Sequence, residues 1–305
     1  MSTISHDRLN IIMAYCGNHG DEKTLKKFNI SNETLGRYKR KFKFFETRQP
    51  KVLIFDVENF PIKIYSWGIF KQTVSHDFII SDTAVISWSA KWLFGSEVMG
   101  DILTPEEALK RDDKRVLKSI WKLLEEADII IAHNAIKFDV RVLNARFILN
   151  GLKPTSPYQV IDTLQIAKKN FRFTSNRLDY LGKLFTNKGK IDTNFDLWRG
   201  CDNGDQESLD YMLKYNKEDV NLLEEVYLEL RPWMRSHPNM AIYKEANEEV
   251  CPTCGSDNVI DCGEYSTPAG RFDSLRCNDC GGISRRRKSN LSKHQKDNLL
   301  ISTAR

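Results

Sequence analysis

The sequence contains no apolar run that approaches the roughly 20 residues needed to cross a membrane. Residues 9–17, LNIIMAYCG, could be mistaken for a short signal sequence, but they follow Asp7 and lead into a polar, basic segment. We therefore expect a cytoplasmic protein without a membrane partner. In a reducing compartment its seven cysteines are expected to be thiols or metal ligands rather than disulfides.

A strong net charge is also absent, but the overall +5 conceals an uneven distribution. Residues 1–51 hold eleven Lys/Arg against five Asp/Glu (+6), and residues 281–305 hold seven against one (+6). Residues 52–280 hold 28 against 35 (−7). Two basic ends around an acidic middle indicate a polyanionic partner, most often nucleic acid. Composition alone equally allows two solvated tails.

The segment 1–50 is expected to form a small helical domain of three helices. The second helix, DEKTLKKFNI, has Asp21 as a candidate cap, and the third, SNETLGRYKRKFKFF, has Ser31 or Asn32. Two short helices joined by a tight turn, the second rich in Arg and Lys, resemble a helix-turn-helix unit. The alternative is a packing appendage. The side chains that would face a groove or a phosphate backbone are Asn32, Thr34, Arg37, Tyr38 and Arg40.

Strand-like and helix-like segments alternate between residues 51 and 238, which is typical of an α/β domain. The first three strands follow one another directly, so the sheet is expected to begin antiparallel. The expected strands cover 51–58, 62–70, 84–94 and 128–134, and the expected helices cover 104–127, 137–151, 162–170, 176–185 and 205–234.

Two acids end the first strand, in the stretch VLIFDVENFP. Because residues i and i+2 of a strand point to the same face, Asp56 and Glu58 present two carboxylates side by side. Such groups repel unless a cation or a proton separates them, and carboxylate oxygens suit Mg²⁺ or Mn²⁺. The alternative is a strand end that faces solvent.

Two further segments place acids on helices. Asp139 begins a helix shortly after the strand that ends near Asn134, and a carboxylate at a helix N-terminus is favourable by itself. Tyr215 and Asp219 lie four residues apart on the long helix and therefore share a face. Each pattern alone is also compatible with a solvated acid on an ordinary helix.

Together, and in this order, the three motifs resemble the DEDDy branch of the DnaQ-like 3′–5′ exonucleases, which includes the proofreading domains of family B DNA polymerases. The resemblance covers about 51–233, within a domain expected at 51–238, and implies a ribonuclease H-like fold, in which a mixed five-stranded sheet is flanked by helices. No polymerase palm or fingers follow this segment.

The resemblance also implies that four acids hold two Mg²⁺ or Mn²⁺ ions: Asp56, Glu58, Asp139 and Asp219. In this scheme Asp56 bridges both ions, and Tyr215 orients the attacking water. Asn134 would contact the end of the substrate strand. We expect Phe138 to pack its helix against the sheet and Asp162 to cap a helix rather than to act in catalysis.

Four cysteines in two Cys-x-x-Cys pairs predict one structural Zn²⁺ in a zinc ribbon at 248–288: Cys251, Cys254, Cys277 and Cys280. Each pair is followed by glycine, as a zinc-knuckle turn requires. Cys16, Cys201 and Cys262 are expected to be ordinary thiols. A basic tail at 289–305 lacks hydrophobic periodicity and is expected to be poorly ordered without a partner.

These features favour a metal-dependent 3′–5′ exonuclease that acts on DNA rather than RNA, with the zinc ribbon as a candidate site for a protein partner. Three alternatives stay open. They are an RNA-processing exonuclease on the same scaffold, a DNA-binding factor with an idle nuclease centre, and a transposase or resolvase. The last is disfavoured because transposase acids usually lack a second acid two residues after the first.

Overall fold

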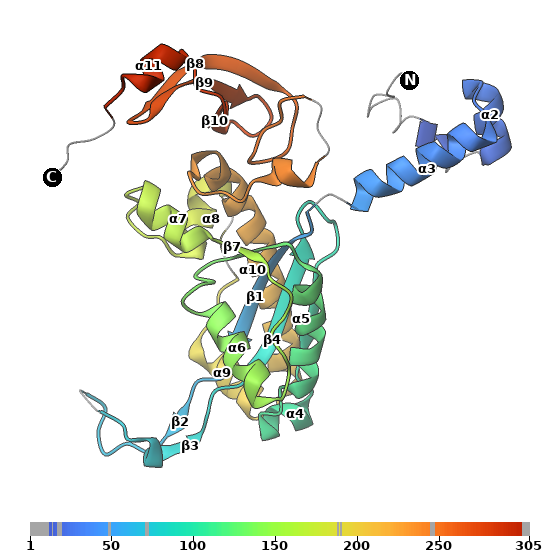
Figure 1. The fold of residues 1–305 in the computed structure, drawn as a ribbon. Helices are drawn as coiled ribbons and strands as arrows, with labels where there is room; N and C mark the ends of the chain where they lie inside the picture. Colours follow the sequence, from blue (N-terminus) through green and yellow to red (C-terminus); the bar gives the residue numbers. More distant parts are fainter. Residues whose placement is uncertain are drawn as a thin grey trace.

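A computed structural model describes residues 12–13, 15–16, 20–47, 50–70, 73–187, 189, 191–244 and 248–300, without the side chains of 40–47 (Figure 1). Its centre is a five-stranded sheet in the order β5-β4-β1-β6-β7. The strands are β1 (Val52–Asn59), β4 (Val85–Trp92), β5 (Met99–Ile102), β6 (Ile129–Ala132) and β7 (Gln159–Asp162). β4 runs antiparallel to both β1 and β5, whereas β6 is parallel to β1 and to β7. The expected mixed sheet is confirmed.

Alternation along β1 divides the core into two layers. Leu53, Phe55 and Val57 belong to one buried cluster with α5 (Lys114–Glu126). Val52 and Ile54 belong to the other, with much of α10 (Gln206–Leu230). Since the side-chain period of a strand is two, the even-numbered positions continue toward the α10 layer. The two acids at the end of β1 occupy even-numbered positions, so their side chains lie on the face toward α10.

The helices that surround the sheet follow the sequence prediction with two exceptions. The segment 104–127, expected as one helix, forms α4 (Pro105–Lys110) and α5, because Arg111 adopts a left-handed conformation (φ 51°) that ends α4. α9 (Phe195–Asp202) was not predicted. The other helices are α6 (Asp139–Leu149), α7 (Thr163–Asn170) and α8 (Leu178–Thr186), and the long α10 continues into the 3₁₀ turn η2 (Arg231–Trp233).

A hairpin arm replaces the strand expected at 62–70, so that prediction was wrong. Only β2 (Lys63–Ile64) is strand there, and it pairs with β3 (Ile79–Ser81). Figure 1 shows this pair projecting from the end of β1, away from the rest of the sheet. The alternating apolar residues of this segment favour β structure, but in the arm they do not cover a face of the central sheet.

The described part of the N-terminal segment contains α2 (Asp21–Phe28) and α3 (Asn32–Thr47). Most of the first expected helix lies outside the described residues. Asp21 does not cap α2, because it is the first helical residue and its carboxylate accepts from Lys39 on α3 at 2.7 Å. The hydroxyl of Ser31 accepts from the Thr34 amide at 3.1 Å, which confirms Ser31 as the cap of α3.

The C-terminal segment forms a three-stranded sheet of β8 (Val259–Thr267), β9 (Gly270–Cys277) and β10 (Ile283–Arg285). The basic tail is more regular than expected. Ser292 and Gln295 form a capping box that starts the short helix α11 (Lys293–Asp297), a local signal that hydrophobic periodicity does not report. Across the described residues, none of the helices has the length and apolar character required to span a bilayer.

Candidate active site

Asp56 and Glu58 lie where β1 leaves the buried centre of the sheet. They pair with Ser89 and Ser87 of β4, and both are partly exposed, whereas Val57 between them is 3% exposed. The two carboxylates therefore lie on one face of the strand, as the i, i+2 spacing predicted. The strand register shifts directly after Glu58, where the chain turns into the hairpin arm.

The long helix α10 brings the third acid to the same place. One ligand atom from each of Asp56, Glu58 and Asp219 lies within 4.8 Å of the others. Asp219 is 1% exposed, although an isolated charge at such a depth is costly. Three hard oxygen donors at this separation form a donor set that suits a divalent cation.

Tyr215 lies one turn before Asp219 on α10 and is 7% exposed. Its ring packs edge-on against Trp198 of α9, with the ring centroids 6.3 Å apart. α9 was absent from the sequence prediction, yet it helps to fix this ring. The i, i+4 relation predicted for Tyr215 and Asp219 is present on a helix that contacts β1 and β4.

Asp139 is the first residue of α6 and is 2% exposed, so it begins a helix as the sequence predicted. Within the described part of the chain, it does not belong to the carboxylate group that lies within 4.8 Å. The structure therefore brings three of the four expected acids within 4.8 Å of one another, and Asp139 is not a member of that group. Phe138, expected to pack against the sheet, is instead 45% exposed.

The turn before α6 is held by Asp162. Its carboxylate accepts from the amides of Asn134 (3.1 Å) and Ile136 (3.2 Å) and also from Gln165 in the first turn of α7. Asn134 adopts φ 82°, a left-handed conformation that asparagine tolerates better than most residues. The capping role predicted for Asp162 is confirmed. The same carboxylate also shapes the turn that presents Asn134.

Asn216 is a site residue that the sequence analysis missed. It is fully buried, and its side-chain amide donates to Oδ2 of Asp56 at 2.7 Å. Its carbonyl oxygen accepts from the hydroxyl of buried Ser87 at 3.3 Å. β4 and α10 thus jointly orient the first acid of β1. The sequence offered one signal for Asn216, its place directly after Tyr215. Only the packing shows that its side chain reaches Asp56.

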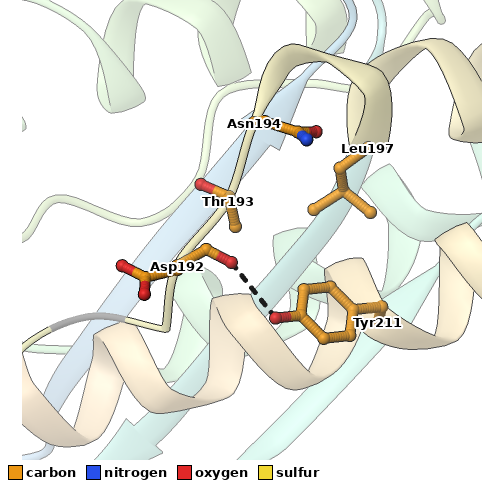
Figure 2. A pocket seen from close by; sticks show the side chains of 5 residues that line it. All are labelled: Asp192, Thr193, Asn194, Leu197 and Tyr211. Atoms are coloured by element: carbon orange, nitrogen blue, oxygen red, sulfur yellow. Dashed lines mark hydrogen bonds between the residues drawn. The ribbon is translucent and has the colours of Figure 1, made fainter.

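Two cavities lie near these residues. One, of about 370 Å³, is lined by Leu197 and Tyr211 together with the loop before α9, and the Tyr211 hydroxyl donates to the Asp192 carbonyl at 3.1 Å (Figure 2). The other, of about 620 Å³, includes Asn134 and the basic side chains of Lys168 and Arg177. The second cavity, whose lining holds these two basic side chains and one acid, Asp179, lies beside the turn that leads to Asp139.

The four predicted zinc ligands converge. One sulfur from each of the four residues lies within 4.8 Å of the others, and the pairs Cys251–Cys280 and Cys254–Cys277 are each 3.6 Å apart. A tetrahedron with Zn–S bonds of about 2.3 Å has edges of about 3.8 Å. The sulfur positions therefore fit a closed, structural Zn²⁺ site.

The backbone around the cysteine cluster supports the same fit. The amides of Thr253 and Gly282 each point to a cysteine sulfur at 3.4 Å, which stabilises negative charge on the sulfurs. Gly255 (φ 76°) and Gly281 (φ 74°) adopt left-handed conformations after the two pairs. The two turns therefore have the same backbone conformation after each cysteine pair.

The other cysteines have different surroundings. Burial raises the pKa of Cys201 to about 12 and raises that of Cys16 as well, so both are neutral thiols at physiological pH. Cys262 is exposed on β8.

Of the two arginines expected to contact nucleic acid, Arg37 is exposed on α3, and the side chain of Arg40 lies outside the described part.

A sequence profile of the RNase_H superfamily matches residues 101–231, from β5 through α10. No curated protein sequence matches the chain. Among solved structures, the chain is similar to the family B DNA polymerase of the hyperthermophilic archaeon Pyrobaculum calidifontis, with 16% identity and a TM-score of 0.46. That match covers 60% of this chain and 25% of the polymerase, so the chain spans about a quarter of the polymerase length. The profile match and the sheet order identify a ribonuclease H-like fold, whose members are usually nucleases.

Proposed function

We propose that the protein is a metal-dependent 3′–5′ exonuclease that hydrolyses phosphodiester bonds of DNA. The observation that carries the proposal is the convergence of Asp56, Glu58 and Asp219 within 4.8 Å at the end of β1. A solvated acid on an ordinary helix would be exposed, whereas Asp219 is almost fully buried beside two other acids. A nuclease uses such a cluster to hold divalent cations, because the phosphodiester that it cleaves is already negative and repels an attacking hydroxide.

These three acids would hold one divalent ion, and Asp139 at the start of α6 would support a second. When bound, two such ions lower the pKa of a water molecule and neutralise charge on the leaving 3′ oxygen. Tyr215, held by Trp198, would orient the attacking water through its hydroxyl. The other residues of the site would orient the acids or the substrate, and would not themselves form or break bonds.

Asn134 would contact the end of the substrate strand, because its turn leads directly into α6 and lines the basic cavity. The choice of DNA rests on the α2–α3 pair, where Arg37 is exposed, and on the surplus positive charge at both ends of the chain. The four-cysteine cluster would hold one Zn²⁺, which would stabilise the three-stranded sheet rather than take part in hydrolysis.

The test uses the purified full chain with Mn²⁺ or Mg²⁺ on single strands of DNA and RNA that carry a label at the 5′ end. We expect a ladder of products shortened one nucleotide at a time on DNA and slower digestion of RNA. Asp219→Ala should abolish the ladder. Asp210→Ala changes an exposed acid on the same helix and should leave it intact.

Three outcomes would contradict the proposal. Internal cuts would indicate an endonuclease, and faster digestion of RNA would reverse the substrate. Retention of more than about a tenth of the rate by Asp219→Ala would show that the carboxylate cluster is not the reaction centre.

A further inference from the structure

The hairpin arm between Asn59 and Ala84 exposes most of its apolar side chains. On the outgoing chain, four side chains toward the tip are the most exposed, with Trp67 at 92%, Ile69 at 88%, Phe70 at 84% and Tyr65 at 70%. The arm's other large apolar side chains are less exposed, from 36 to 51%: Ile62, Ile64, Val74, Phe78, Ile79 and Ile80. An exposed apolar surface of this kind usually marks an interaction site.

The root of the arm is firmly held. The guanidinium of Arg111 donates to the carbonyls of Pro61 (2.9 Å) and Asp82 (2.7 Å), and so ties the outgoing and returning chains together. Asp202 of α9 accepts from Arg111 at 2.9 Å and pairs with Lys63 at 2.5 Å. Arg111 and Asp202 are each about a tenth exposed. The arm therefore projects from a fixed base rather than hanging from a loose loop.

The arm continues the strand that carries the acids. Trp67 follows Glu58 by nine residues, a reach of at most about 30 Å at 3.3 Å per residue. Stacked nucleotides advance about 3.4 Å each, so the tip lies up to about nine nucleotides from the acids. At this maximal separation, a 20-nucleotide strand bound at the carboxylate cluster is long enough to reach the tip, whereas a stacked trinucleotide, about 10 Å long, is not.

The chemistry of the arm favours bases over phosphates. The segment 59–84 holds two lysines and two aspartates, so its net charge is zero and it offers no surplus charge to a phosphate backbone. Three of the four most exposed tip side chains are aromatic. Flat aromatic faces bind unpaired bases by stacking, without regard to sequence.

We propose that the tip of the arm, through Tyr65, Trp67 and Phe70, stacks on unpaired bases of the nucleic-acid strand whose end occupies the carboxylate cluster. This inference rests on the proposed nuclease function. It assigns to the arm a base-binding surface that is separate from the acids and from the basic ends of the chain.

The test compares three variants of Trp67 in the full chain. Trp67→Tyr keeps a flat ring, Trp67→Leu keeps an apolar side chain without one, and Trp67→Ala removes both. Trp233→Ala is the matched control, because Trp233 is an exposed tryptophan (64%) on η2. Affinity for a 20-nucleotide single strand is measured in an Asp56→Ala background, which prevents cleavage, and trinucleotide hydrolysis is measured with Asp56 intact.

We expect Trp67→Ala and Trp67→Leu to weaken binding of the 20-nucleotide strand by about 5- to 150-fold, the range typical for loss of one base-stacking contact. Trp67→Tyr and Trp233→Ala should bind nearly as well as the parent chain. The loss should be similar at low and high salt, because stacking releases no counterions. All four variants should hydrolyse the trinucleotide at the parent rate.

Equal affinity of all variants for the long strand would overturn the inference. So would full affinity of Trp67→Leu, because binding of the strand would then not depend on a flat ring that stacks on a base. A change in oligomeric state on Trp67→Ala, with unchanged affinity per chain, would assign the arm to a second copy. Failure of the parent chain to hydrolyse either substrate would instead reject the nuclease function and leave the binding comparison readable.

Discussion

Removal of the Asn216 side chain should impair metal binding without unfolding the protein. Asn216 donates to Oδ2 of Asp56 at 2.7 Å from a fully buried position. Ser87 donates to the same amide group at 3.3 Å, a long and therefore weak bond that favours the amide orientation in which the nitrogen faces Asp56. In Asn216→Ala the Asp56 carboxylate loses this donor and can rotate away from the orientation that the other acids require.

The size of the effect follows from the kind of bond. A hydrogen bond to a charged group contributes about 1.5–3 kcal/mol, which corresponds to about 10- to 150-fold in an equilibrium constant. Loss of a residue that orients a metal ligand typically costs about 10- to 100-fold in metal affinity or activity. We therefore expect Asn216→Ala to need about 10- to 100-fold more Mn²⁺ for half-maximal hydrolysis. Ser87→Ala should need less than about tenfold more, because the donor to Asp56 remains.

The assay is a Mn²⁺ titration of the initial rate on a short single-stranded DNA, combined with thermal unfolding in the absence of Mn²⁺. Asn221→Ala is the matched control, since Asn221 is a half-exposed asparagine on the same helix. It should titrate like the parent chain. A purely structural role for Asn216 would lower the unfolding temperature and leave the Mn²⁺ midpoint unchanged, and that result would refute the reasoning.

Three further predictions concern other parts of the molecule. Tyr215→Phe should lower the rate by about 10²-fold with an unchanged unfolding temperature, and an unchanged rate would make Tyr215 a core residue. Cys277→Ser should release zinc, measured by atomic absorption, and open the 248–288 segment to limited proteolysis, whereas retained zinc would contradict the proposed ligand set. Burial lowers the pKa of His237, whose Nδ1–H donates to the Pro238 carbonyl while Nε2 accepts from Tyr227. The unfolded chain then binds more protons, so stability should rise with pH up to about the ordinary histidine pKa near 6.5, and His237→Gln should flatten that slope in thermal unfolding.

The parts of the site that depend on local spacing were predictable from the sequence. Asp56 and Glu58 share a face because strand periodicity is two, and Tyr215 and Asp219 share a face because they are four apart on a helix. The two glycines after the cysteine pairs likewise specify a backbone conformation that few other residues adopt. In each case the geometry is fixed within one element, so no knowledge of packing is needed.

The parts that depend on contacts between elements were not predictable in this way. The bond from Asn216 to Asp56 joins residues 160 positions apart, and nothing local distinguishes Asn216 from other polar residues of α10. The prediction of a strand at 62–70 was wrong for a related reason. Its alternating apolar residues satisfy the pattern of a half-buried strand, but only the tertiary structure shows that no face is buried. Arg111 ended α4 through a left-handed conformation that arginine rarely adopts.

The extensive packing of α10 helps to offset the cost of burying Asp219. Two ionised carboxylates with oxygens 4.8 Å apart would repel by about 3.5 kcal/mol at an effective dielectric constant of about 20, and the three acids of this centre have oxygens within that distance of one another. That repulsion is comparable with the whole stability of a typical domain, about 5–15 kcal/mol. Protons, cations or packing must offset it. α10 supplies the packing through an apolar face buried along its length and through the largely buried pair of Glu224 with Lys91 at 2.6 Å, which joins the helix to β4. A divalent ion bound among the three acids would replace this repulsion by attraction to the ion. α10 holds the acids together before an ion binds, so it is also the element that such an ion would stabilise most.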